Sequence, residues 1–480
     1  MRANLSFKSV SSILICLVTF SVSSRDYPCR AQDRDPLDRP NVVLIFVDDS
    51  GYGDYAHNGN PVIETPAISK LAHEGVNFTQ FYVTSPACSA SRYSLLTGRY
   101  PARSGLGTWV VGPDAATHLR LNETTIAEGL KSRGYATAMF GKWHLGNPNP
   151  RNNMTSAALP LAHGFDSWIG TNVSHDYDDA KLLASDPAGN DPIPGYRMLA
   201  DQLPSNPQAS ASLTGLYVES AEAFIRAHRD HPFFLYLAPN QPHLGLYVTE
   251  PFAGKSRRGL LGDVMLELDD GIDRIVRTLQ ECQIAENTII IYTSDNGPWI
   301  RFQDTVDHPK YGEARMHVGY AQPFRDGKGS NWEGGHRVPG IVYWPGTIPP
   351  CRQLEPASTL DLLPTLFALC GVNQPLDVDG RDIRPLLAPD QFAGEVPPFK
   401  LAYSGSKNMP HAYREGAWKI HWSISSQTGD DYGFTASREH PLLFQLEQDL
   451  GERVDRAAEH PEIVAELSQH LEKLIDTFQQ

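Results

Sequence analysis

This chain has few cysteines and, after its first residues, no long hydrophobic run. Only six cysteines occur among 480 residues, too few for a fold built on disulfides. Cys351 and Cys370 could form one bridge, or they could be separate buried thiols. No later apolar stretch approaches the length of about 20 residues that a membrane-spanning helix needs. The sequence therefore excludes a disulfide-built scaffold and predicts a mature protein with no membrane partner.

Positive charge is also in deficit. Lys and Arg number 41 against 56 Asp and Glu, and the formal net charge is −15. Proteins that bind nucleic acid usually carry a basic surface, so this balance argues against a nucleic-acid partner and against adhesion to polyanions in general. Its simplest explanation is solubility. With 41% hydrophobic and 20% charged residues, the chain has the composition of a globular protein with a sizeable core.

The N-terminal residues 1–31 have the layout of a secretory signal peptide. Arg2 and Lys8 precede an apolar run over residues 13–22, and small and polar residues follow it. The run is too short to span a membrane. Cleavage after Ala31 would leave a mature protein that is secreted or periplasmic.

Short apolar runs predict the buried strands of one central sheet. These runs are residues 41–47, 136–140, 233–238, 288–293 and 341–344. Helical patterns lie between them, and the clearest places apolar side chains at three- and four-residue spacing over residues 268–279. Strands that alternate with helices predict an α/β sandwich, with a large central sheet flanked by helices.

A change of composition near residue 390 predicts a domain boundary. Short alternating segments such as residues 417–422 come after it, followed by a final helix with an apolar face over residues 463–478. We therefore predict a main domain over residues 32–390 and a small C-terminal α+β domain with an antiparallel sheet over residues 391–480. Residues 185–212 are rich in Pro, Ser, Asn and Asp, which predicts a long loop.

Two of the predicted strands end in carboxylate or amide side chains. Asp48 and Asp49 follow the first strand, and Asp295 and Asn296 follow the strand at 288–293. Either pair alone is most often a turn. Three carboxylates and an amide at matching strand ends, however, need a cation to offset their charge, and oxygen ligands suit a hard cation. The sequence therefore predicts a metal site at one edge of the sheet.

One cysteine lies in an unusual segment, Ser-Pro-Ala-Cys-Ser-Ala-Ser-Arg, which contains Cys88 and Arg92. A lone cysteine is most often a small buried hydrophobic residue. A helix that begins near Cys88, however, would place Arg92 on the same face. A helix N-terminus and a nearby cation favour an anion, whether a thiolate or a bound oxyanion.

Two lysines and two histidines complete the set of candidates. Lys142 and His144 lie in Gly-Lys-Trp-His after a predicted strand, Lys328 lies between two glycines, and His243 follows the strand at 233–238. Glycines beside a lysine let the backbone come close and leave the ammonium pointing into a cavity. Taken alone, each lysine would be a solvated surface charge and His243 a structural imidazole.

Together and in this order, these segments resemble the type I sulfatase family, and most closely its arylsulfatase A-like members. Further matching segments are Gly-Tyr-Gly-Asp at 51–54, Leu-Thr-Gly-Arg at 96–99 and Trp-Glu-Gly-Gly at 332–335. The resemblance runs over residues 41–345, with a weaker echo at 446–452. It implies an alkaline-phosphatase-like sandwich, a catalytic domain over residues 32–390, and a sulfatase, that is, a sulfuric ester hydrolase.

The resemblance also implies a nucleophile and a metal. A formylglycine-generating system would oxidise Cys88 to formylglycine, and the hydrated aldehyde would attack sulfur and later expel sulfate by collapsing to the aldehyde. Ca2+ is the expected ion and Mg2+ the alternative. The implied ligands are Asp48, Asp49, Asp295, Asn296 and the modified residue 88.

The remaining candidates receive roles in the same way. Arg92, Lys142 and Lys328 would hold the hydrate and the sulfate oxygens. His144 would contact the hydrate and assist its collapse, and His243, with Lys328, would protonate the leaving oxygen. Ala90 stands where the family pattern has Pro; because the modifying enzyme reads this segment as an extended peptide, we expect the change to affect that encounter rather than the finished site.

The substrate implied is a sulfated carbohydrate cleaved in exo fashion, with aryl sulfate esters as artificial substrates. Loops over residues 109–118, 147–191 and 298–321 would select it. Two alternatives stay open. A phosphoester or phosphonate hydrolase of the same superfamily could use a similar metal and cation set. A non-catalytic sulfate-binding protein could retain the pocket and leave Cys88 unmodified.

Overall fold

The computed structural model describes residues 39–107, 109–300, 318–374, 376–405, 409–426, 429 and 432–478. The signal peptide predicted at 1–31 lies outside them. None of the described helices is long and apolar enough to cross a membrane.

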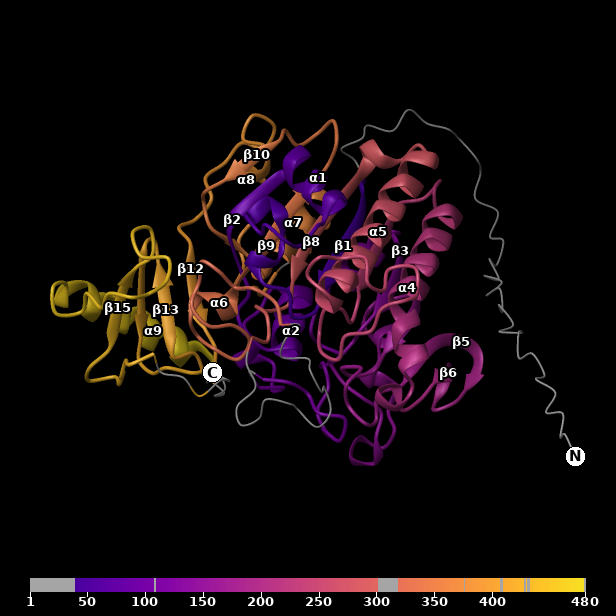
Figure 1. Cartoon of the computed structure of the whole chain (residues 1–480), viewed down its shortest axis with the longest axis horizontal. Helices are drawn as coiled ribbons and strands as arrows, with labels where there is room; N and C mark the ends of the chain where they lie inside the picture. The colour runs from indigo at the N-terminus through magenta and orange to yellow at the C-terminus, as the bar shows by residue number, and fades with distance from the viewer. Residues whose placement is uncertain are drawn as a thin grey trace, which may run out of the picture. The chain divides into compact units, whose positions relative to one another are not determined.

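Among the described residues, an 11-stranded mixed sheet forms the centre of the protein (Figure 1). Its strands, in spatial order, are β10 (Cys351–Gln353), β2 (Val76–Tyr82), β9 (Arg337–Tyr343), β8 (Thr288–Ser294), β1 (Asn41–Val47), β7 (Phe233–Ala238), β3 (Ala136–Gly141), β4 (Ser167–Thr171), β5 (Leu182–Asn190) and β6 (Pro194–Ala200), with β11 (Ala357–Ser358) also paired to β2. Strands β8, β1, β7, β3 and β4 run parallel to one another, while β9 is antiparallel to both of its neighbours. The predicted large central sheet is confirmed, and it is mixed.

Helices cover both faces of this sheet, which explains why β1 is apolar from Val42 to Val47. Val42, Leu44 and Phe46 pack on one face with α2 (Cys88–Thr97), α3 (Ile126–Ser132) and α7 (Leu362–Leu369). The alternate residues of β1 pack on the other face with α1 (Pro66–Glu74), α4 (Pro207–Ala227) and α5 (Leu260–Glu281). Helix α5 contains the helical pattern predicted at 268–279.

The C-terminal segment forms the predicted antiparallel sheet. Its strands are, in order, β12 (Lys400–Tyr403), β13 (Ala412–Glu415), β14 (Trp418–His421) and β15 (Leu442–Gln445). The final helix, α9 (Pro461–Phe478), packs on them through Leu467, Leu471 and Ile475. The same apolar cluster includes Tyr82 and Leu360 from the earlier part of the chain. The boundary at residue 390 stays a prediction.

Two further expectations from the sequence concern a long loop and a pair of cysteines. The loop predicted at 185–212 is wrong, because β5 and β6 form a hairpin there and α4 begins at Pro207. Pairing of β5 with the distant β4 overrides the local composition. Of the two cysteines whose pairing was left open, Cys351 is exposed and Cys370 is buried, and both are free thiols in the described structure. Two short helices, α6 (Glu333–His336) and α8 (Arg384–Leu387), follow β8 and α7 in the described residues.

Candidate active site

The register of β1 and β8 brings the predicted acidic residues together. Val47 pairs with Ser294, so Asp48 and Asp295 emerge side by side where the two parallel strands end. The backbone N–H of Asp49 donates to the Oδ1 atom of Asp295 at 3.0 Å. Two segments that lie far apart in the sequence therefore meet at one edge of the sheet, as the sequence predicted.

Strands β7 and β3 add the next candidates along the same edge. Gly141 pairs with Ala238, and the N–H of Lys142 donates to the carbonyl of Ala238 at 2.8 Å. A Cβ on Gly141 would lie 1.9 Å from that carbonyl oxygen, so only glycine fits. His243 follows β7. Strands β8, β1, β7 and β3 are neighbours in the sheet in this order, so the candidate residues that follow their ends lie along one edge.

Asp49 and His144 hold left-handed backbone conformations, with φ angles of 62° and 58°. This region is unfavourable for residues other than glycine and is used where the surrounding structure enforces it, often at active sites. In both cases the conformation turns the chain sharply just after a buried strand. It directs the two side chains to the edge where the other candidates lie.

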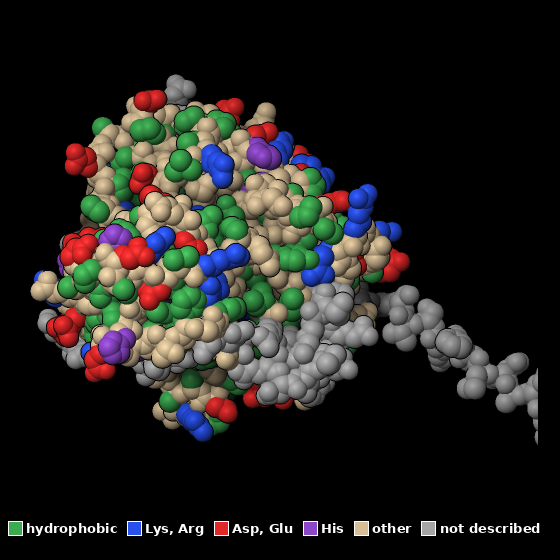
Figure 2. All heavy atoms as spheres, turned by 60° about the vertical axis from the view of Figure 1, so that its left-hand side comes forward, with side chains coloured by type: hydrophobic (Ala, Val, Ile, Leu, Met, Phe, Trp, Pro, Cys, Tyr) green, Lys and Arg blue, Asp and Glu red, His purple; other side chains and the backbone are tan. Residues whose placement is uncertain are grey.

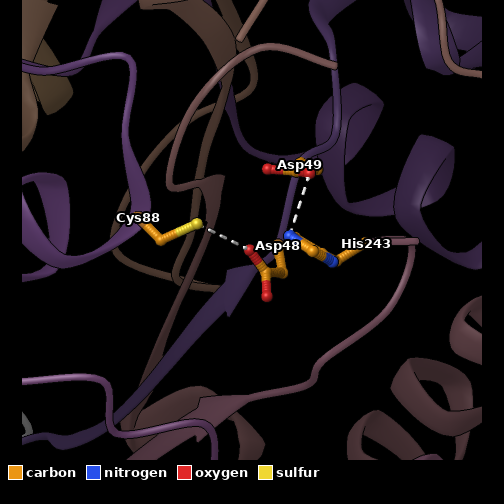
Figure 3. Close-up of side chains that lie close together, drawn as sticks. All are labelled: Asp48, Asp49, Cys88 and His243. Carbon is orange, nitrogen blue, oxygen red and sulfur yellow. Dashed lines mark hydrogen bonds and ion pairs between the residues drawn. The ribbon is translucent and has the colours of Figure 1, made fainter. Parts of the chain in front are cut away.

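Cys88 is the first residue of α2 and is buried. Its Sγ atom donates to the Oδ1 atom of Asp48 at 3.5 Å (Figure 3). One turn later, Arg92 places its Nη2 atom 2.7 Å from Asp295 and 3.7 Å from Asp48. The expectation that a helix sets Cys88 and Arg92 on one face is met.

Each candidate carboxylate lies beside a candidate cation. Lys142 Nζ is 2.6 Å from Asp48, Lys328 Nζ is 2.8 Å from Asp49, and Arg92 pairs with Asp295 as above. All six side chains are buried. Charges removed from water in this way need partners at hydrogen-bonding distance, because breaking one buried pair leaves the other charge uncompensated.

This charge pattern sets the protonation of the centre. Burial alone would raise the pKa of Asp48, but Lys142, His243 and Arg92 hold it well below its ordinary value. Burial and the charge of Asp48 raise the pKa of Asp295 to about 7, against the effect of Arg92. Burial also raises the pKa of the Cys88 thiol far above its usual range. The encoded thiol is therefore neutral and, as it stands, a poor nucleophile.

The two histidines present different atoms to the centre. His243 bonds the carbonyl of Leu244 through Nδ1 and places Nε2 3.5 Å from Asp49 (Figure 3). Neither ring nitrogen of His144, which is fully buried, has a hydrogen-bond partner. Burial, with the positive charges of Lys142 and Arg92, lowers the pKa of His144. A neutral imidazole with two unused nitrogens is suited to a partner that arrives with the reaction.

Comparison with known proteins identifies the family. Residues 40–372 match the family model for Sulfatase. The chain belongs to the sulfatase family. Arylsulfatase A of Bos taurus is 36% identical over 462 residues, which cover 91% of this chain and 87% of that protein. N-acetylgalactosamine-6-sulfatase of Sus scrofa is 36% identical over 460 residues, which cover 86% of this chain and 81% of that protein.

The architecture of this sulfatase also matches. The PsFucS1 sulfatase from Pseudoalteromonas sp. superposes with a TM-score of 0.77 at 27% identity, covering 92% of this chain and 91% of that one. The predicted type I family, its resemblance to arylsulfatase A and the alkaline-phosphatase-like fold are therefore confirmed. The protein is an enzyme, a sulfuric ester hydrolase, and its substrates carry sulfate.

The donor atoms of the sulfatase fit a hard cation. Asp48, Asp49, Cys88 and His243 each offer a ligand atom, and these atoms all lie within 4.8 Å of one another (Figure 3). Asn296 donates through its amide nitrogen to Asp49 at 2.7 Å, which leaves its Oδ1 atom buried without a partner. The two carboxylates and the unused amide oxygen have the ligand chemistry of Ca2+ or Mg2+, whereas the sulfur of Cys88 and the ring nitrogen of His243 are not donors that these ions prefer.

Three aromatic residues near this centre carried no recognisable signal in the sequence. The ring of Trp299 lies 6.0 Å from that of His243 and 5.1 Å from Lys328 Nζ. His175 lies 5.7 Å from His243, and Tyr177 lies 5.8 Å from His144, ring to ring. All three belong to segments that were expected only as substrate-selecting loops. Nothing in their local sequence shows that the loops return to the strand ends.

Proposed function

We propose that this sulfatase removes sulfate from the end of a sulfated carbohydrate, using formylglycine made from Cys88 and a Ca2+ ion. The proposed ligands of the ion are Asp48, Asp49, residue 88, Asp295 and Asn296, with Mg2+ as the alternative ion. The observation that supports the proposal most is the place of Cys88. It begins a helix, touches a metal-ligand candidate and lies in a cluster with three buried cations.

Oxidation of Cys88 by a formylglycine-generating system would replace CH2SH by an aldehyde. Its hydrate supplies a hydroxyl that attacks sulfur and a second hydroxyl that can release sulfate afterwards. The neutral state of the encoded thiol supports this proposal, because an unmodified Cys88 offers little thiolate. His144, with two unused ring nitrogens, is placed to hold a proton of the hydrate.

Three cations of the chain would bind the sulfate group. Arg92 and Lys142 are fixed by Asp295 and Asp48 on the side where Cys88 lies, and Lys328 is fixed by Asp49. Because they are already oriented, they can stabilise charge on the sulfate oxygens without reorganising. A bound Ca2+ would add Lewis-acid polarisation of a sulfate oxygen and lower the pKa of the attacking hydroxyl.

His243 and Lys328 would protonate the leaving group. The Nε2 atom of His243 faces the centre while Nδ1 is engaged by a backbone carbonyl. Lys328 lies on the same side, beside Asp49. A sugar alkoxide leaves slowly without a proton, so these two side chains would supply one to the leaving oxygen.

A carbohydrate substrate is supported by the surroundings of the site. The rings of Trp299, His175 and Tyr177 lie close to the proposed acid and to His144, and aromatic side chains commonly line small-ligand pockets. On the face drawn in Figure 2, the described Lys and Arg side chains are interspersed with Asp and Glu. Such a surface holds long polyanions weakly, which favours exo action. A secreted or periplasmic location belongs to the same proposal.

Rates on two artificial esters test the reaction class. We expect kcat/KM for nitrophenyl sulfate to exceed that for nitrophenyl phosphate by at least about 100-fold, because each of the three cations is already paired with a carboxylate, which leaves less excess positive charge for a dianionic phosphate ester than for a monoanionic sulfate ester. Mass analysis of the tryptic peptide from Leu71 to Arg92, from the same preparation, should show an aldehyde or its hydrate at position 88. Faster phosphate hydrolysis would support the phosphoesterase, and a CH2SH side chain alone would support a non-catalytic binding protein.

Metal affinity should depend on pH through Asp295. Its pKa is raised to about 7, so below that pH a proton competes with the ion for the carboxylate. Affinity for Ca2+ should therefore weaken by about tenfold per pH unit below 7 and level off above 8. Isothermal titration calorimetry at pH 5.5 to 8.5 measures this. Asp295→Asn should bind more weakly and lose most of the slope; an affinity of the parent that stays constant over this range would contradict the assignment.

A further inference from the structure

A buried ionic cluster lies between the C-terminal sheet and α6. Lys419, on β14, places Nζ 3.0 Å from Glu333 and 2.9 Å from Glu452. His421 Nε2 also lies 2.9 Å from Glu452, and all four side chains are fully buried. We call these four residues the Lys419 cluster.

In this cluster, the Glu333 carboxylate has hydrogen-bond partners for its oxygens and is ionised. The hydroxyls of Tyr82 and Tyr403 donate to Glu333 at 2.7 and 3.1 Å. Burial alone would raise the pKa of Glu333, but Lys419 and the nearby arginines lower it to about 2. Buried charges of this kind rarely stabilise a fold more than apolar side chains of the same volume would. Such a cluster can instead fix the position of the segments that contribute its residues.

The position they fix is that of α6. Glu333 is the first residue of this helix, and its backbone N–H donates to the second oxygen of Glu452 at 2.7 Å. Both the side chain and the backbone of Glu333 are therefore held by residues of the C-terminal segment. Helix α6 cannot shift without breaking contacts on both sides of this one residue.

Two site segments rest directly on α6 by backbone contact. The N–H of Gly297 donates to Gly335 at 3.0 Å, directly after the proposed ligand Asn296. A Cβ on Gly335 would lie 2.7 Å from the carbonyl oxygen of Gly327, beside Lys328. Because these contacts join backbone to backbone, no side chain can change its rotamer to accommodate a movement of α6. A displacement of α6 would therefore move Asn296 and Lys328 together.

The C-terminal segment also contacts residues 326–331, the loop that contains Lys328, on the side away from α6. The side-chain amide of Asn331 donates to Ser423 at 2.7 Å, and its oxygen accepts from the N–H of Ser425 at 2.9 Å. Ser426 donates to Asp326 at 2.6 Å. Residues 326–331 thus lie between α6 and the chain that leaves β14.

We propose that Lys419, with Glu333 and Glu452, is a positioning residue that sets the places of Lys328 and Asn296 in the active site. The C-terminal sheet then positions residues of the catalytic centre, although it provides none of the proposed catalytic or metal-binding side chains. The role given to Lys328 in this inference rests on the proposed function, whereas the link to Asn296 can be measured through metal binding alone.

The test uses the charge-matched double variant Lys419→Met/Glu452→Gln of the full-length protein. A single change at Lys419 would leave two buried carboxylates facing each other, which destabilises strongly. Glu452→Gln alone is a milder second variant that keeps the shape of the side chain. Lys400→Met is the matched control, because Lys400 forms a half-exposed pair with Glu415 at 2.9 Å in the same sheet.

Two measurements separate positioning from simple stabilisation. Ca2+ affinity of the folded protein should fall by about tenfold in the double variant. Across aryl sulfates, kcat should fall at least about tenfold more for poor leaving groups than for good ones, because a displaced Lys328 no longer assists them. A merely smaller folded fraction would lower all rates equally. Glu452→Gln should change both quantities in the same direction by less, and the control should match the parent.

The proposal is overturned if the folded variants bind Ca2+ as the parent does and show the same dependence on the leaving group. A parent that hydrolyses no aryl sulfate would contradict the proposed function instead. In that event the Ca2+ titration still decides whether the Lys419 cluster positions Asn296.

Discussion

Replacement of Cys88 by alanine is expected to abolish sulfate ester hydrolysis, lowering kcat by roughly four orders of magnitude or more. Alanine cannot be oxidised to an aldehyde, so the proposed nucleophile is never formed. Apart from the 3.5 Å hydrogen bond from Cys88 to Asp48, the cations and carboxylates around position 88 pair with one another, so the pocket should survive the change. Initial rates on nitrophenyl sulfate, with protein saturated in Ca2+, give the comparison.

Cys370→Ala provides the matched control. Cys370 is also buried, but it belongs to the apolar core and lies outside the proposed site. Its replacement should cost about 1 to 2 kcal/mol of unfolding free energy through a small cavity and leave kcat unchanged. Activity of Cys88→Ala within tenfold of the parent would remove residue 88 from the mechanism, provided that its thermal unfolding shows a folded protein.

The strand ends could be predicted from the sequence because their signal is local. A strand buried on both faces is apolar throughout, so the first acidic residues after 41–47 mark its end without knowledge of its neighbours. Helix α2 was predictable for a similar reason, since four-residue spacing alone places Cys88 and Arg92 on one face. Both inferences needed no contact between distant segments.

The pairings inside the site were beyond such reasoning. Arg92 meets Asp295 at 2.7 Å across a sequence separation of 203 residues, and no local pattern shows that α2 lies against the end of β8. The left-handed conformations of Asp49 and His144 were equally hidden, because neither residue is the glycine that usually indicates them. Strand order and backbone strain are properties of the whole fold.

The segment Trp-Glu-Gly-Gly at 332–335 is recognisable in the sequence, but the reason why these residue types are needed there is visible only in the structure. Its glycines are required because a Cβ on Gly334 would lie 2.2 Å from the carbonyl oxygen of Asp326. Its glutamate is required by partners on β14 and beyond β15. Neither partner lies near the segment in sequence. The pattern thus predicts membership of a family, whereas its function as a support for the site emerges only in three dimensions.

Replacement of His243 by alanine should separate substrates by their leaving groups. With a sugar sulfate, loss of the proposed proton donor should lower kcat by about 1000-fold. With nitrophenyl sulfate the loss should stay within about tenfold, since nitrophenolate leaves without a proton. The observation behind this contrast is the orientation of His243, whose Nε2 atom faces the centre while Nδ1 is held by the carbonyl of Leu244.

His144→Ala provides the contrast that makes the result specific. His144 faces the same centre but is proposed to act on the hydrate, before and after the leaving group departs, so its loss should lower both rates by similar factors. Ion chromatography of released sulfate measures both substrates on one scale. Equal losses for His243→Ala on the two esters would contradict its role as the acid and leave Lys328, 2.8 Å from Asp49, as the group that delivers the proton.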